Sequence, residues 1–305
     1  MGTPDFAAES LRALLKNDYN ISAVFCQPDK KQGRGMKIAE CDVKKIALQN
    51  NLKVYQPVTL RDNIQVDIIK TLNPDIIVVV AYGKILPESI LSIPKYGCIN
   101  VHGSLLPKYR GAAPIQWSVI NGEKETGITT MFMDKGLDTG DIILQEKISI
   151  GENETSEELF DRMMVLGGEV LINTLKLFEN GEVIRKKQSE DKATYASLLS
   201  KEMGHIDFNK SAKEVHNLIR GLYSWPCAYS LLNGKRFKIL SSKIIANIDG
   251  KPGEVIFSDK KNGFVVSCGD NCGISIEKLQ FDGKKAMDIK DFFVGNTISK
   301  GTILE

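Results

Sequence analysis

The chain has 305 residues, of which 42% are hydrophobic, and a formal net charge of +2. Single domains usually hold roughly 100–200 residues, so this length favours two buried cores. The small charge argues against a whole-molecule nucleic-acid binder, and the lack of a secretory start or a membrane-length apolar run predicts a soluble, cytoplasmic protein.

Six cysteines are sparse for this length, so we expect reduced thiols. The one close pair, Cys268 and Cys272, has no His or second Cys pair nearby, and we expect no metal there.

Apolar β-type runs alternate with helical patterns from the start of the chain to about residue 150. The strand candidates are residues 21–26, 75–81, 97–101, 126–133 and 142–148. This alternation predicts an α/β domain with a Rossmann-like, doubly wound, mostly parallel sheet. Residues 76–80 are apolar at every position, which indicates a central strand buried on both faces. Further on, Thr155 and Glu158 form a capping box that opens an amphipathic helix, and Gly181 ends it.

The start of the chain, Gly2-Thr3-Pro4-Asp5, has the pattern of a strand-to-helix turn. Thr3 is the expected N-cap and Pro4 the first helical residue. The sequence lacks the strand that would precede such a turn. The turn also lacks the G-x-G-x-x-G spacing of a dinucleotide site, so the α/β pattern gives no reason to infer NAD.

Residues 185–206 are charged and weakly patterned, and we predict that residues 191–205 link a catalytic domain, residues 1–190, to a second domain, residues 206–305. The second domain opens with a short helix and continues as short β-type runs separated by Asn-Gly and Asp-Gly turns, which predicts a small antiparallel barrel or sandwich. Residues 200–305 hold 16 Lys and Arg against 12 Asp and Glu. This surplus suits contact with phosphate, and a solvated basic face is the alternative.

The strongest chemical signal is the run of residues 98–111, C-I-N-V-H-G-S-L-L-P-K-Y-R-G. Asn100 and His102 are two residues apart, so on an extended strand their side chains share a face and can converge on one substrate atom. We predict a catalytic pair because open α/β sheets place their sites at the carboxyl ends of strands. A turn-capping Asn and a structural, hydrogen-bonded His are the alternatives.

A carboxylate for this pair is expected from the Gly-bracketed loop G-L-D-T-G-D, residues 136–141. An acid that orients His102, or that relays a proton through water, must come from a separate segment. We choose Asp138 over Asp141, and an Asp that merely forms a turn is the alternative. An amide, an imidazole and a carboxylate suit acyl-group transfer, with Asn100 as the oxyanion donor and His102 as the general base.

Two other segments are candidates for binding. The leucines of residues 104–107 either form a wall for a flat heteroaromatic ring or fill the core. Arg34 lies between two glycines in a segment that also holds Lys30 and Lys37. Such a cation on a flexible arm can contact nucleic-acid phosphates, and a solvated basic loop is the alternative.

Taken together, these residues show that the chain resembles the methionyl-tRNA formyltransferase family over nearly its whole length. The matching stretches include M-G-T-P-D-F-A, G-R-G, A-Y-G-K-I-L-P, N-V-H-G-S-L-L-P, Y-R-G-A-A-P-I, G-L-D-T-G-D and W-P. The H-G-S-L-L-P and L-D-T-G-D segments are shared with other enzymes that use 10-formyltetrahydrofolate, including sugar-amine formyltransferases. T-P-D-F and the G-R-G loop are specific to the tRNA substrate.

The resemblance implies transfer of the formyl group of 10-formyltetrahydrofolate to the α-amino group of methionine on initiator tRNA, without a metal. Asn100, His102 and Asp138 would be catalytic. The folate pocket would be lined by Ile85, Leu86, Ser104, Leu105, Leu106 and Pro107. The arm with Lys30, Arg34 and Lys37 would reach the acceptor stem, and residues 206–305 would form an OB-like domain that holds the tRNA. We expect a monomer.

The chain departs from that family in two places. Members usually carry a short apolar strand ahead of M-G-T-P-D-F, so we expect either a misplaced start or a lost strand. Members also often have P-S-P-V-K where this chain has E-C-D-V-K, at residues 40–44. Two alternatives stay open: a sugar-amine formyltransferase, which has no use for a long basic arm, and a non-catalytic RNA-binding protein on an enzyme scaffold.

Overall fold

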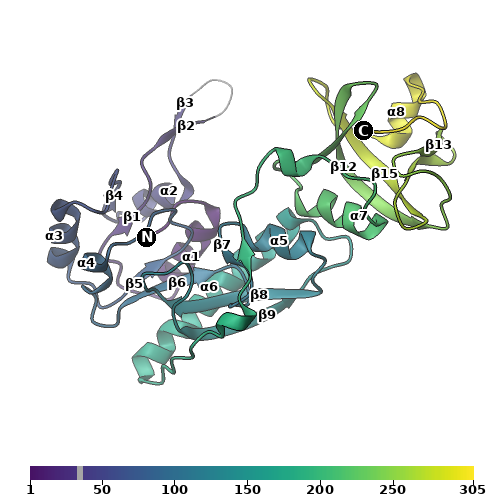
Figure 1. Cartoon of the computed structure of the whole chain (residues 1–305). Helices are drawn as coiled ribbons and strands as arrows, with labels where there is room; N and C mark the ends of the chain where they lie inside the picture. The colour runs from purple at the N-terminus through teal and green to yellow at the C-terminus, as the bar shows by residue number, and fades with distance from the viewer. Residues whose placement is uncertain (33–36) are drawn as a thin grey trace. The chain divides into compact units, whose positions relative to one another are not determined.

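The computed structural model describes residues 1–32 and 37–305, and the chain divides into two compact units (Figure 1). The first unit comprises Met1–Gly111, Thr126–Ile148 and Phe160–Tyr195. The second comprises Ala112–Glu125, Ser149–Leu159 and Ala196–Glu305. Two segments from the first half of the chain thus belong to the second unit. The domain limits at residues 190 and 206 stay a prediction.

The first unit has an α/β architecture. Its helices are α1 (Asp5–Lys16), α2 (Asp42–Gln49), α3 (Asn63–Leu72), α4 (Glu88–Leu91) and α6 (Ser156–Asn180), with a 3-10 turn, η1 (Glu190–Lys192). Its strands are β1 (Val24–Phe25), β2 (Lys30–Gln32), β3 (Lys37–Ala39), β4 (Val54–Tyr55), β5 (Ile77–Val79), β6 (Cys98–His102), β7 (Arg110–Gly111), β8 (Glu125–Phe132), β9 (Ile142–Ser149) and β10 (Tyr195–Ala196). Each strand candidate of the sequence contains or overlaps one of these strands.

The central sheet has the strand order β5-β6-β8-β9, and its pairing is mixed. β5 runs parallel to β6, with Ile77 opposite Cys98, whereas β8 runs antiparallel to β6, with Thr129 opposite His102. The α/β class is therefore confirmed, and the central sheet is mixed rather than wholly parallel. The doubly wound, mostly parallel arrangement stays a prediction. Between β6 and β8 the chain passes through α5 (Pro114–Ile120) and re-enters the sheet at the end where β6 leaves it, which residue patterns do not reveal.

β5 is buried, as its continuous apolar run predicts: Ile77 and Val79 are buried and Val78 is partly exposed. The core around it consists of Phe25, Leu60, Val66, Ile69, Ile77, Val79, Tyr82, Leu86, Ile90 and Cys98. Cys98 is the first residue of β6, so this core anchors the strand whose far end carries Asn100 and His102.

The first two residues lie between β1 and β5. The Gly2 amide donates to the Phe25 carbonyl at 2.9 Å, and the Val80 amide donates to the Met1 carbonyl at 2.9 Å. A cavity of about 720 Å³ adjoins them and is lined by residues of α1, β1, β5 and α6. The described chain thus pairs with both strands through only its first two residues.

Helix α1 begins one residue later than predicted. Asp5 is its first residue and Pro4 is the N-cap, which makes no side-chain capping bond. The Thr3 hydroxyl oxygen instead accepts from the Gln27 amide at 3.3 Å, and the hydroxyl donates to the Tyr82 carbonyl at 3.4 Å. The expected Thr3 cap is therefore wrong, because the amide of a distant residue, and not one of the helix, donates to its oxygen.

The capping box of α6 is confirmed. The Thr155 amide donates to Glu158 Oε2 at 2.8 Å, and the Glu158 amide donates to Thr155 Oγ1 at 3.2 Å. Two of the free amide groups at the helix start are thereby satisfied. Gly181 follows the last residue of the helix with φ +70°, as a left-handed helix end requires.

The second unit carries most of the C-terminal half. Its helices and 3-10 turn are α5, η2 (Glu202–Gly204), α7 (Ala212–Gly221) and α8 (Ile289–Gly295). Its strands are β11 (Ala228–Leu232), β12 (Lys235–Ala246), β13 (Val255–Asp259), β14 (Gly263–Ser267), β15 (Cys272–Phe281) and β16 (Met287–Asp288). The helix opening this region is held by a capping box between Ser211 and Glu214.

The strands of the second unit form one antiparallel sheet in the order β11-β12-β15-β14-β13, with β16 paired to β15. The predicted antiparallel strands are confirmed. In the part of the chain that the structure describes, no pairing joins β11 to β13, so the sheet is not a closed barrel. Within the described residues, no helix is both long and apolar enough to cross a membrane.

Candidate active site

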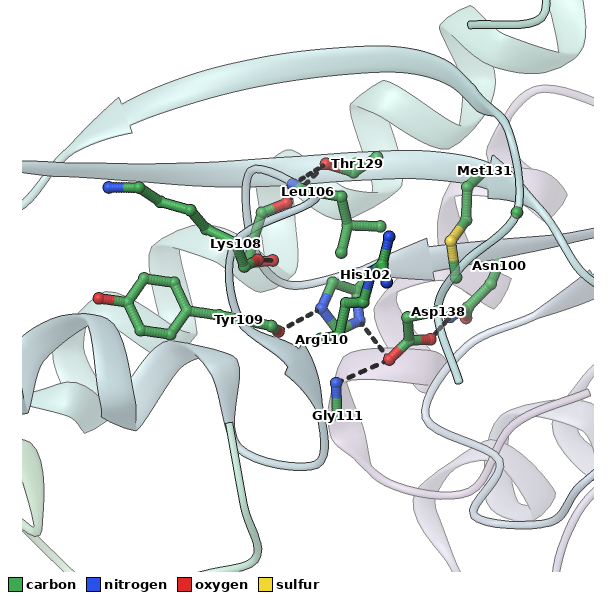
Figure 2. Close-up of polar contacts among 12 residues, drawn as sticks. Asn100, His102, Leu106, Lys108, Tyr109, Arg110, Gly111, Thr129, Met131 and Asp138 are labelled. Atoms are coloured by element: carbon green, nitrogen blue, oxygen red, sulfur yellow. Dashed lines mark hydrogen bonds and ion pairs between the residues drawn. The ribbon is translucent and has the colours of Figure 1, made fainter. Parts of the chain in front are cut away.

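The end of β6 presents the two side chains that the sequence singled out. Asn100 and His102 are two residues apart on this strand, so both side chains project to the same face of the sheet (Figure 2). Asn100 is partly exposed and His102 is buried. The amide is therefore accessible to a ligand, while the imidazole is held within the protein.

The loop after β8 brings a carboxylate to both side chains. Asn100 Nδ2 donates to Asp138 Oδ1 at 3.4 Å, and His102 Nδ1 lies 3.6 Å from Asp138 Oδ2. The Gly111 amide donates to the same Oδ2 at 2.8 Å (Figure 2). The predicted amide, imidazole and carboxylate thus share one centre. Asp141 points elsewhere and pairs with Arg185 at 2.9 Å.

A backbone carbonyl determines which nitrogen of His102 carries a proton. His102 Nε2 lies 2.9 Å from the Tyr109 carbonyl oxygen, which can only accept, so Nε2–H is the donor. In the neutral ring Nδ1 is then a lone pair that faces Asp138 Oδ2. Nδ1 and Asp138 Oδ2 are therefore both acceptors, and they lie 3.6 Å apart.

Tyr109 and Gly111 were not predicted as contributors, because they act through backbone groups. Tyr109 has φ +61°, an uncommon value for a residue with a side chain. Its amide donates to Thr194 Oγ1 at 2.9 Å, and the Arg110 amide donates to the Thr194 carbonyl at 2.8 Å. No residue type in the sequence signals these contacts, which come from a segment about 85 residues away.

Ser104 and Leu106 of the 104–107 loop are buried and bind other residues of the protein. Leu106 is buried against Met131 and Ile142, and its amide donates to Thr129 Oγ1 at 3.1 Å. The Ser104 hydroxyl donates to the Lys108 carbonyl at 2.6 Å. The core-filling alternative therefore describes Leu106.

The remaining apolar residues assigned to the folate pocket differ in accessibility. Leu105 and Pro107 are partly exposed, and Ile85 is 79% exposed. Leu86 is buried in the core around β5. The folate-binding role of all these residues stays a prediction, and Leu105, Pro107 and Ile85 have the surface that a ligand could contact.

The basic arm is described only in part. Arg34 lies outside the described residues, as does the side chain of Lys37. Lys30 begins β2, which pairs antiparallel with β3, and its ammonium donates to Gln27 Oε1 at 2.9 Å. At the base of this hairpin Lys44 pairs with Asp29 at 2.6 Å and lowers the pKa of that carboxyl.

Within residues 1–32 and 37–305, no group of three or more His, Cys, Asp and Glu side chains is placed to hold a metal ion. Cys268 and Cys272 are both free thiols. The pKa of the Cys268 thiol is raised to about 12, chiefly by burial, which keeps it protonated.

The fold and the site together define a formyl transferase. A family model described as "Formyl transferase" matches residues 1–175, and one described as "Formyl transferase, C-terminal domain" matches residues 198–297. A crystallised sugar 3N-formyl transferase, in the presence of dTDP and 5-N-formyl-THF, is 26% identical with a TM-score of 0.68. The match covers 93% of this chain and 97% of that one.

The chain belongs to the methionyl-tRNA formyltransferase family. It is 50% identical over 305 residues to the methionyl-tRNA formyltransferase of Alkaliphilus metalliredigens (strain QYMF), covering 100% of this chain and 96% of that relative. It is 52% identical over 305 residues to that of Alkaliphilus oremlandii (strain OhILAs), covering 100% and 98%. This full-length identity favours the tRNA enzymes over the sugar enzymes, and the predicted family is confirmed.

Proposed function

We propose that the chain transfers the formyl group of 10-formyltetrahydrofolate to the α-amino group of methionyl initiator tRNA, with Asn100, His102 and Asp138 as its catalytic residues. Membership of the family supports the reaction and both substrates. The observation that supports the residues is that the Asn100 amide and the His102 imidazole both lie within 3.6 Å of the Asp138 carboxylate.

The nucleophile needs little activation. A free α-amino group has a pKa of about 7.7–8.0, and an aminoacyl ester is more acidic, so much of the amine is neutral at pH 7. Attack on the formyl carbon forms a tetrahedral intermediate with a negative oxygen. The Asn100 amide has two N–H groups and uses one on Asp138, so the other can donate to this oxygen. Such a donor contributes about 3–4 kcal/mol to the transition state.

The proton of the attacking amine must reach the folate nitrogen that leaves. The His102–Asp138 pair has one proton position between Nδ1 and Oδ2, so it accepts the proton from the ammonium and returns it to the leaving nitrogen. General acid–base transfer of this kind contributes about 10²–10⁴ in rate. The Nε2 bond to Tyr109 keeps the ring oriented through both transfers.

Other roles follow from the same proposal. Leu105, Pro107 and Ile85 would contact the folate ring, and Ser104, Leu106 and Leu86 would support that pocket from beneath. Lys30, Arg34 and Lys37 would contact the acceptor stem. Residues 1–190 would form the catalytic domain and residues 206–305 an OB-like tRNA-binding domain joined by residues 191–205. A cytoplasmic monomer fits this role.

The test is incubation of the purified chain with 10-formyltetrahydrofolate and methionine-charged initiator tRNA, followed by detection of N-formylmethionine after mild deacylation. A parallel reaction offers a dTDP-linked amino sugar as acceptor. Formylmethionine without formylated sugar supports the proposal. Formylated sugar without formylmethionine contradicts it, as does no transfer to either acceptor.

A further inference from the structure

Gln188 holds the backbone of the loop that carries Asp138. Its side-chain Nε2 donates to the Asp138 carbonyl at 2.8 Å and to the Gly140 carbonyl at 2.8 Å. Its Oε1 accepts from Arg110 Nε at 3.1 Å and from an Arg110 terminal nitrogen at 2.9 Å. Both N–H groups and both lone pairs of this amide are therefore in use.

Arg110 anchors the other side of that amide. Its side chain is fully buried, and it forms a two-point ion pair with Glu190 at 2.9 and 2.8 Å. The hydrogen bond to Glu190 raises the pKa of Arg110 and lowers that of Glu190, so both stay charged. A buried guanidinium with its donors occupied has a rigid position, because any movement leaves an unpaired charge.

The backbone on either side of Arg110 contacts both His102 and Asp138. Arg110 stands between Tyr109, whose carbonyl accepts the His102 Nε2 bond, and Gly111, whose amide binds the Asp138 carboxylate. Movement of the Arg110 side chain therefore acts on a strand that touches both members of the pair. Figure 2 shows Arg110 beside these contacts.

Asp138 needs this support. Its φ is +54°, a left-handed conformation that a residue with a side chain adopts only when its surroundings impose it. The rest of the loop is closed on itself, since Asp134 Oδ1 accepts from the Gly136 amide at 2.9 Å and from the Thr139 hydroxyl at 2.6 Å. The bonds from Gln188 tie the carboxylate-bearing half of the loop to the body of the domain.

We propose that Gln188 and Arg110 are positioning residues that set the distance between Asp138 and His102. This inference rests on the proposed catalytic role of that pair. Neither residue touches the substrate. They act by fixing the loop backbone and the strand that bind the two catalytic side chains, so that the carboxylate faces Nδ1 before substrate arrives.

The kinetic test compares Gln188→Glu with Gln188→Met. Gln188→Glu keeps an acceptor for Arg110 but loses both donors to the loop, and Gln188→Met loses the donors and the acceptor. Both should lower kcat by about 10²-fold, the effect of a misplacement near 1 Å, with KM for folate and tRNA nearly unchanged. Asp141→Asn is the control, because it removes an ion pair with the 60% exposed Arg185 from the same loop and leaves the Gln188 bonds intact. Its kcat should stay within about 3-fold of wild type.

A double variant separates positioning from general weakening of the fold. If Gln188 acts through Asp138, then Gln188→Glu adds no further loss of kcat to Asp138→Asn. Losses that multiply would overturn the proposal. A fall in kcat for Asp141→Asn equal to that for the Gln188 variants would overturn the selective role of Gln188.

A second measurement does not depend on turnover. The chain has three histidines, so the ring ¹⁵N signals of His102 can be assigned with His205→Gln and His216→Gln. At pH 7, both Gln188 variants should move the His102 signals toward those of Asp138→Asn, and Asp141→Asn should not. Unchanged His102 signals in both Gln188 variants overturn the proposal. Absence of formyl transfer by the wild type contradicts the proposed function alone, since these signals are read from the protein without substrate.

Discussion

Replacement of Asp138 by Asn tests the proposed site most directly, because it changes charge and hydrogen bonding but hardly any volume. The Asp138 carboxylate accepts from two donors, the Gly111 amide at 2.8 Å and Asn100 Nδ2 at 3.4 Å. An Asn side chain offers only one acceptor oxygen. Whichever way it turns, its NH₂ group faces one of these donors.

The expected magnitude has two parts. A donor–donor contact leaves a buried polar group unsatisfied, which costs about 1–3 kcal/mol of stability. The neutral amide also cannot share a proton with His102 Nδ1 as a carboxylate does, so the rate of the chemical step should fall by about 10²–10⁴. Affinity for tRNA should be unchanged, because Asp138 lies in a loop of the first unit beside His102 and bears no tRNA-binding assignment.

The assay is single-turnover formylation with excess enzyme at pH 7, with folded protein verified by thermal melting. Asp141→Asn is the matched control, since it removes an acid from the same loop that pairs with Arg185 at the surface. That pair contributes about 0–1 kcal/mol, so the control should keep nearly wild-type turnover. Equal rates for Asp138→Asn and wild type would refute the proton-transfer role, and equal losses in the two variants would refute the choice of Asp138 over Asp141.

Three further outcomes are expected. Asn100→Ala should lower kcat by about 10²–10³ with tRNA affinity preserved, as measured by steady-state kinetics and filter binding; a smaller loss would mean that another group binds the oxyanion. Leu106→Ala should lower the free energy of unfolding by about 2–5 kcal/mol in urea titrations, because its side chain is buried, and a change below 1 kcal/mol would contradict that burial. Burial, and then the charge of Arg220, lower the pKa of His216, so the unfolded state binds more protons as pH falls below about 6.5 and stability is lost there; His216→Gln should weaken that loss in urea midpoints between pH 5 and 8, whereas exposed His205→Gln should not.

Features that depend on near neighbours in the chain were predicted well. Asn100 and His102 share a face because side chains alternate along any strand. The capping box of helix α6 is present because its two partners, Thr155 and Glu158, are three residues apart. The burial of β5 follows from its uninterrupted apolar run.

Features that depend on distant segments were predicted less well. The direction of β8 relative to β6 depends on how the chain returns to the sheet after α5. Thr3 is a good capping residue by type, but its hydroxyl oxygen accepts from the Gln27 amide, 24 residues away. Leu106 had two acceptable environments, and contact with Met131 and Ile142 decided between them.

The residue types of the proposed catalytic set were determined by the sequence alone, because an amide and an imidazole two residues apart on a strand, with a Gly-rich acidic loop downstream, suit few chemistries. The sequence analysis chose Asp138 over Asp141, but only the tertiary structure shows that Asp138 faces His102. The position of that carboxylate depends on the Gly111 amide and the Gln188 side chain, which are 27 and 50 residues from Asp138 and approach it only in the folded chain.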